Sequence, residues 1–159
     1  MEKNASIVRS QIIPLNGMSL VLPNTCIAEV INYSAPMPVE NAPDWFLGNL
    51  LWRGITIPIV SFEAANEVPS AEISKVTRIA VLNGVSGKNK LSFYGVIVQG
   101  IPRLAALEQT DIQEKAKADS VLPCALSQTE IADQDAVIPD QVKIENMLEK
   151  AGAQTGGIY

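Results

Sequence analysis

The residues that could carry out chemistry are few in this chain and lie far apart. It contains no histidine, so the commonest general base and the usual zinc ligand are missing. Cys26 and Cys124 stand among apolar residues with no activating base nearby in sequence, which predicts two reduced, buried thiols. Glu130, Asp133 and Asp135 could form an acid–base or metal-binding group, but they lack the spacing of a calcium loop. A solvated turn is the favoured interpretation of these carboxylates.

Residues 84–88 (Gly-Val-Ser-Gly-Lys) superficially resemble a phosphate-binding loop. The spacing is two residues short, and Asn89 stands where Ser or Thr would bind magnesium. We therefore predict a polar hairpin tip in which Lys88 and Lys90 are solvated. No cofactor and no metal site are expected.

The composition is typical of a globular protein with an aliphatic core. Of 159 residues, 47% are hydrophobic and only 5% aromatic. The net charge of −5, with no run of Lys or Arg, argues against nucleic-acid binding. No apolar stretch approaches the roughly 20 residues that cross a bilayer, and the first residues do not resemble a secretory signal. We therefore expect a cytoplasmic protein without membrane insertion.

Short strands dominate the pattern, at about nine places along the chain. Asn16 and Gly17 predict a hairpin turn, because both residue types tolerate positive φ. Residues 32–44 hold three prolines and are expected to be irregular, and Pro58 indicates an edge strand or a bulge. Residues 105–120 are polar and predict a solvated loop. The clearest strand signals cover residues 6–15, 18–22, 25–31, 55–62, 76–82, 91–98, 121–126 and 136–138.

A helix is expected over residues 141–151, with Asp140 as its N-cap and Gly152 as its stop. Its apolar residues recur at the spacing of one helix face: Ile144, Met147, Leu148 and Ala151. Together the elements predict a mainly β fold, as one antiparallel barrel or two small barrels, with a C-terminal helix. We expect one domain over residues 1–151 and a flexible tail over residues 152–159.

Residues 22–62 contain a series of motifs whose order and spacing resemble those of the CheW family of chemotaxis coupling proteins. The motifs are Leu22-Pro23, Ile27-Ala28-Glu29-Val30, Pro43-Asp44-Trp45, Gly48, Arg53-Gly54 and Pro58-Ile59-Val60. A weaker likeness continues through residues 93–101 and ends with Ile138-Pro139-Asp140 and the terminal helix.

This resemblance implies a fold of two small five-stranded, SH3-like β-barrels packed around a shared groove. It also implies a protein without catalytic activity, which couples the cytoplasmic tips of chemoreceptors to the regulatory domain of a CheA-type histidine kinase. Ile27, Glu29, Gly48 and Arg53 match family positions that are linked to this coupling, and they are the expected partner-binding residues. Trp52, beside Arg53, joins them as a candidate if its side chain points outward.

Physical chemistry suggests roles for these residues, with alternatives left open. Arg53 could present a planar donor fork to a carboxylate or to helix-end carbonyls, or it could form an internal salt bridge with Glu29. Gly48 could let a partner backbone come close. Trp45 is expected to fill space between two lobes, as large aromatic residues usually do.

The chain also departs from the family pattern. Ser61 and Gln99 stand where the family often has Asp, and Trp52 is unusual before the Arg-Gly pair. These changes suggest a divergent accessory coupler, for example in a type IV pilus (twitching) system. Two rival hypotheses remain: a small-barrel module that binds a peptide or other ligand outside chemotaxis, and an enzyme that uses Glu130, Asp133 and Asp135.

Overall fold

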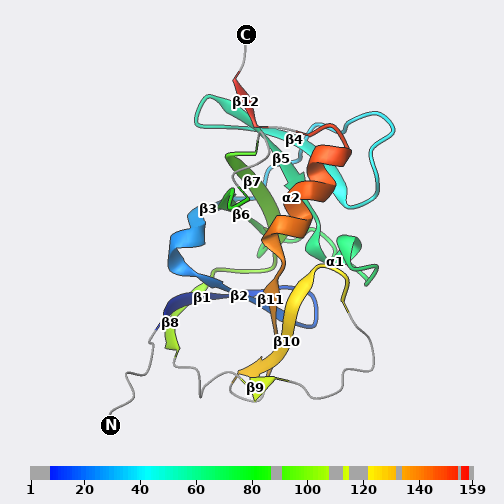
Figure 1. The fold of residues 1–159 in the computed structure, drawn as a ribbon. Helices are drawn as coiled ribbons and strands as arrows, with labels where there is room; N and C mark the ends of the chain where they lie inside the picture. Colours follow the sequence, from blue (N-terminus) through cyan, green and yellow to red (C-terminus); the bar gives the residue numbers. More distant parts are fainter. Residues whose placement is uncertain are drawn as a thin grey trace.

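The structure is a computed structural model that describes residues 8–86, 91–107, 113–114, 122–131, 134–153 and 155–157. Its strands form two sheets, one below the other in Figure 1. The first sheet contains β1 (Val8–Pro14), β2 (Ser19–Pro23), β8 (Arg103–Leu107), β9 (Gln113–Glu114), β10 (Ala125–Ile131) and β11 (Gln134–Pro139). The second sheet contains β3 (Ile27–Asn32), β4 (Phe46–Trp52), β5 (Ile55–Val60), β6 (Arg78–Asn83), β7 (Phe93–Val98) and β12 (Gly156–Gly157). The helical elements are the 3-10 turn η1 (Asn24–Cys26), α1 (Phe62–Ala65) and α2 (Gln141–Lys150).

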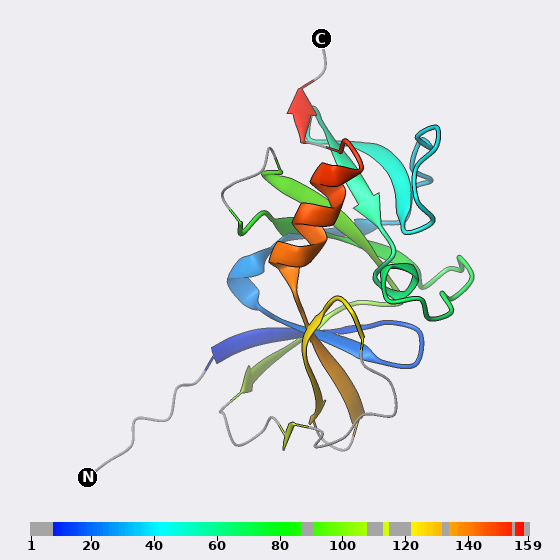
Figure 2. The same ribbon diagram turned by 45° about the vertical axis from the view of Figure 1, so that its right-hand side comes forward.

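Each sheet contains strands from separate parts of the sequence, because the chain passes from one sheet to the other and back. The first sheet has the order β8-β1-β2-β11-β10-β9 and takes strands from both ends of the chain. The second has the order β12-β5-β7-β6-β3, with β4 also paired to β5. After α2 the chain returns to the second sheet through β12, and Figure 2 shows the helix beside that sheet.

Neither sheet closes into a barrel, so the prediction of two closed SH3-like barrels was wrong in that respect. Without the two-residue strands β9 and β12, each sheet has the five strands that were expected. Within the described residues, the second sheet ends at β3 on one side and at β4 on the other. The chain between these strands carries Pro36 and Pro38, which lack an N–H donor. It forms only the isolated bridge between Met37 and Asn49 instead of a closing ladder.

The core is aliphatic, as the composition predicted. The largest buried cluster joins both sheets to α2, for example through Ile13, Tyr94 and Leu148. Alternate residues of the second sheet point to its other face, where Trp52 and Ile57 belong to a second buried cluster. The second sheet is therefore buried on both faces, which explains the nearly continuous apolar run of β5.

Several local predictions are confirmed. Gly17 has φ +77° in the turn between β1 and β2, and the Asp140 side chain accepts a hydrogen bond from the Lys143 N–H at the start of α2. The polar loop expected over residues 105–120 overlaps β8, whereas residues 108–112 and 115–120 lie outside the described chain. The prediction of an edge strand at Pro58 was wrong, because β5 is paired on both sides; Pro58 lies between the stretch that pairs with β12 and the stretch that pairs with β7. The alternative, a bulge, is present nearby, between Phe46 and Gly48 in the pairing of β4 with β5.

The described end of the chain is held by specific contacts. Thr155 bonds to the backbone of Phe93, and β12 pairs with the first residues of β5. The division into a domain over residues 1–151 and a flexible tail stays a prediction, because residues 154 and 158–159 are not described. No helix in the described part of the chain is long and apolar enough to cross a membrane.

Candidate partner-binding site

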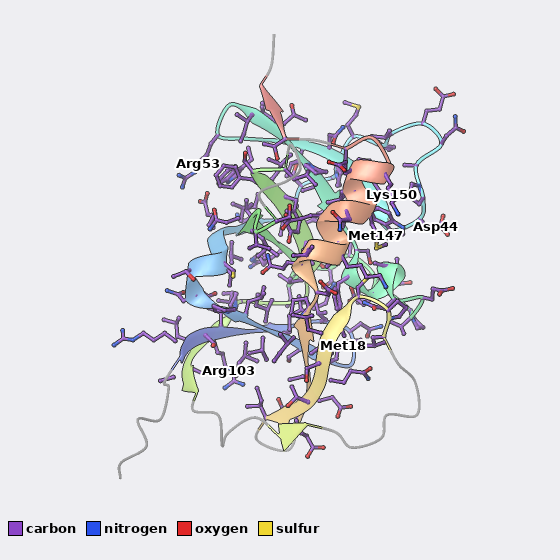
Figure 3. All side chains as sticks on the ribbon, viewed as in Figure 1. Met18, Asp44, Arg53, Arg103, Met147 and Lys150 are labelled. Atoms are coloured by element: carbon purple, nitrogen blue, oxygen red, sulfur yellow. The ribbon has the colours of Figure 1, made fainter. Side chains whose placement is uncertain are left out.

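The hairpin between β4 and β5 places Arg53 at a tip of the second sheet. Trp52 pairs with Ile55, so only Arg53 and Gly54 form the loop. Both have positive φ, at +49° and +80°, as a type I′ turn requires. Glycine adopts this conformation freely, whereas for arginine it costs about 1 kcal/mol. The turn therefore explains Gly54 and directs Arg53 away from the body of the protein, as Figure 3 shows.

A single carboxylate oxygen joins Glu29 to both residues that precede Gly54. The Trp52 Nε1–H donates to Glu29 Oε1 at 2.9 Å, and the Arg53 Nε–H donates to the same oxygen at 3.1 Å. Arg53 Nη2 also lies 3.1 Å from it, and the Arg53 guanidinium carbon lies 5.2 Å from the centre of the Trp52 ring. The Arg53 side chain is thus fixed by an ion pair and a cation–π contact at once.

Both alternatives raised for Arg53 are compatible with this geometry. The internal salt bridge with Glu29 is present, yet the Arg53 side chain keeps 67% of its accessible surface and that of Glu29 37%. An exposed ion pair usually contributes about 0–1 kcal/mol to stability. Stability alone therefore does not explain a positive-φ arginine at this tip, and the guanidinium remains accessible to a partner.

The side chain of Trp52 is buried and contacts both Glu29 and Arg53. It is only 8% exposed, and its ring lies 4.9 Å from that of Phe93, at 56° to it. The condition set for Trp52 as a contact residue, an outward-pointing side chain, is therefore not met. Its indole edge and ring face instead hold Glu29 and Arg53.

A close contact within the protein explains why position 48 is a glycine. Its φ is +138°, and a Cβ there would lie 2.2 Å from the carbonyl oxygen of Met37. The close approach foreseen at this glycine is therefore made by the protein's own backbone, next to the bridge between Met37 and Asn49. The Met37 side chain, by contrast, is 74% exposed.

Ile27 lies at the start of β3, where its partly buried side chain contacts the largest core cluster. A bulge separates Ile27 from Glu29 in the pairing with β6. Of the five predicted site residues, the structure brings Glu29, Trp52 and Arg53 together. Gly48 and Ile27 occupy structural positions nearby in the chain.

The comparisons with known proteins identify the family. Residues 11–146 match the model of the CheW-like domain. The chain belongs to the CheW family. It is also similar to the crystal structure of the scaffolding protein TtCheW from Thermoanaerobacter tengcongensis, with a TM-score of 0.71 at 15% sequence identity. That match covers 87% of this chain and 88% of TtCheW, and at this identity it establishes the fold alone. No protein of curated function matches the chain.

Membership of the CheW family favours a scaffold over an enzyme. Glu130 and Asp135 face each other across β10 and β11, and Asp133 lies outside the described residues. Within the described part of the chain, no three His, Cys, Asp or Glu residues form a group that could hold a metal ion. Cys124 is buried as expected, whereas Cys26 is only partly buried, so the prediction of two buried thiols was wrong for Cys26. Burial raises the pKa of both thiols, which favours their protonated form. The residues expected at the hairpin tip, 87–90, are not described.

Sequence patterns missed two residues that belong to this candidate site. Phe93 supports Trp52 from β7, and Thr155 holds Phe93 from the end of the chain. Both are far from Arg53 in sequence, and no motif links them to it. The proximity arises only when β7, β5 and β12 assemble into one sheet.

Proposed function

We propose that this CheW-family protein is a cytoplasmic, non-enzymatic adaptor that couples chemoreceptors to a CheA-type histidine kinase. The proposal is supported by the family match over residues 11–146 together with the accessible Glu29–Arg53 pair. In this scheme the pair binds the helical hairpin at the cytoplasmic tip of the receptor. The kinase regulatory domain binds exposed strand ends, and the resulting contacts shift the conformational balance of the assembly.

The chemistry of Arg53 suits a helical partner. A guanidinium donates in one plane to a carboxylate or to the unpaired carbonyl groups at the end of a helix. Because Glu29 and Trp52 already restrict the Arg53 side chain, docking requires less additional loss of side-chain entropy. The rival hypothesis, a small-barrel module outside chemotaxis, has no comparable support from the family match.

Two of the departures from the family pattern, Ser61 and Gln99, have local partners in this chain. The Ser61 hydroxyl accepts a hydrogen bond from the Ala64 N–H at the start of α1, and Gln99 Oε1 accepts one from the Thr77 hydroxyl. Both residues line one shallow cavity beside the exposed side chain of Ile73. They are neutral where the family often has a carboxylate, which supports an accessory coupler. A pilus-based system remains part of this hypothesis.

A binding titration with the purified cytoplasmic fragment of a chemoreceptor from the same organism tests the proposal. Arg53→Glu should weaken binding by roughly tenfold or more, because it replaces the donor fork with a charge that repels Glu29. Arg103→Glu is the matched control, since Arg103 is also exposed but lies on β8 of the first sheet. Circular dichroism should show that both variants fold. Equal affinities for Arg53→Glu and the wild type would refute the proposed site.

A further inference from the structure

Residues 155–157 lie against the same part of the second sheet as Trp52. The Thr155 hydroxyl donates to the Phe93 carbonyl at 2.6 Å and accepts from the Phe93 N–H at 3.0 Å. One side chain thereby satisfies both backbone groups of a residue at the start of β7, as a neighbouring strand would. Thr155 therefore fixes the backbone of Phe93.

The two residues after Thr155 contact the hairpin by another route. Gly156 pairs with Thr56 and Gly157 with Ile55, antiparallel to β5. Ile55 is in turn the cross-strand partner of Trp52, beside the Arg53-Gly54 turn. The end of the chain thus extends the sheet alongside the residue that closes the hairpin loop.

Both sets of contacts lead to Trp52, the residue that contacts the Glu29–Arg53 pair. The Phe93 ring packs against that of Trp52 in a tilted arrangement at 4.9 Å, and Trp52 contacts both Glu29 and Arg53. An arginine side chain with 67% exposure would otherwise sample many rotamers, and a partner would have to order it on binding. Any contact that fixes Trp52 therefore lowers the entropic cost of ordering the Arg53 side chain when a partner binds.

We infer that residues 155–157 are a positioning element of the partner-binding site, which fixes Arg53 through Phe93 and Trp52. This inference rests on the proposed function only for its effect on receptor binding. Its structural part, the link between Thr155 and Trp52, stands independently of any partner. Thr155 is a positioning residue in this arrangement and does not itself contact the partner.

The structural part is tested by NMR of the two indole N–H groups, with Trp45, which directly precedes β4 and packs against the largest core cluster, as an internal control. Thr155→Val keeps the shape of the side chain and removes its hydroxyl group, and a chain ending at Ala153 removes the whole element while retaining the buried Ala153. Both changes should move the Trp52 indole signal toward its position in Glu29→Ala. The Trp45 signal should stay in place, and Thr155→Ser should leave both signals as in the wild type.

The functional part is measured with the same variants in the titration against the receptor fragment. Thr155→Val should bind roughly two- to tenfold more weakly, as the loss of ordering around one long side chain predicts, and Thr155→Ser should bind like the wild type. An unmoved Trp52 signal in both Thr155→Val and the shortened chain would overturn the inference. Equal movement of the Trp45 signal would also overturn it, because the element would then stabilise the whole fold. A wild type that does not bind the receptor would instead refute the proposed function.

Discussion

At the scale of single residues, the proposed site depends on Trp52, whose side chain is buried where a surface contact was expected. Trp52 was considered as a surface contact, but it is buried and acts on Glu29 and Arg53 through its indole N–H and its ring face. The sequence identified Glu29 and Arg53 through motifs, because each occupies a fixed place in a short pattern. It could not show that one carboxylate oxygen accepts from both neighbours, since that depends on the register between β3, β6, β7, β5 and β4.

Gly48 provides a prediction about backbone space. Gly48→Ala should lower the free energy of unfolding by about 3 kcal/mol or more, because its Cβ would clash with the Met37 carbonyl and its φ is positive. Gly17→Ala is the matched control: its φ is also positive, but no atom lies within 4 Å of the added Cβ. It should cost only about 1–2 kcal/mol. Urea denaturation measures both, and equal losses would contradict the assigned role of Met37.

Glu63 predicts a dependence of stability on pH. It is 1% exposed, and burial raises the pKa of its carboxyl group. With a folded pKa above the unfolded one, the favourable contribution of this group is complete at low pH and is lost as pH rises through the folded value. Glu63→Gln should therefore gain stability relative to the wild type between about pH 4 and pH 7.

Thermal unfolding across that pH range measures the effect. Glu67→Gln removes a negative charge from an exposed position in the same segment and controls for the change in net charge. A stability difference between Glu63→Gln and the wild type that stays constant with pH would refute this role of Glu63.

At the scale of elements, α2 is attached to the second sheet by polar contacts as well as by its apolar face. Glu145 is fully buried and accepts hydrogen bonds from the backbone N–H groups of Val85 and Ser86, after β6. Gln141 donates to the buried hydroxyl of Tyr94. The helix was predictable from its apolar spacing and its Asp140 cap, but these attachments were not, because buried polar residues in a helix look like solvated ones in sequence.

Removing the Glu145 carboxylate tests this attachment. Glu145→Ala removes the acceptor of the hydrogen bonds from the partly buried Val85 and Ser86 N–H groups, and it should lower the free energy of unfolding by about 1–3 kcal/mol. Amide hydrogen exchange at Val85 and Ser86 should accelerate at the same time. Glu149→Ala, at an exposed position of the same helix, should change stability by less than about 0.5 kcal/mol. Similar effects of the two substitutions would contradict the account of α2.

Strand prediction succeeded where apolar runs were bounded by turn residues, as in β1, β2, β6 and β7. It missed β4 because Gly48 and the Arg53-Gly54 pair were interpreted as loop and motif rather than as parts of one strand and its turn. It missed β8 because the polar residues that follow concealed a short edge strand. Both strands are recognisable only from the neighbours with which they pair.

At the scale of the whole molecule, the family resemblance gave the mainly β fold and the number of main strands, but not the openness of the sheets. Closure depends on hydrogen bonds between segments distant in sequence, and prolines between β3 and β4 prevent one such ladder. The first and second sheets share one core with α2, because the chain passes from one sheet to the other and back.

Reconstitution of a three-component complex tests the central claim, that this protein is an adaptor between receptor and kinase, most directly. The purified protein, a receptor cytoplasmic fragment and the regulatory domain of a CheA-type kinase from the same organism are mixed and analysed by sedimentation velocity. The adaptor account predicts that the kinase domain sediments with the receptor fragment only when the wild-type protein is present. It also predicts that Arg53→Glu abolishes this co-sedimentation, whereas Arg103→Glu does not. Failure of the wild-type protein to join the two partners would contradict the account.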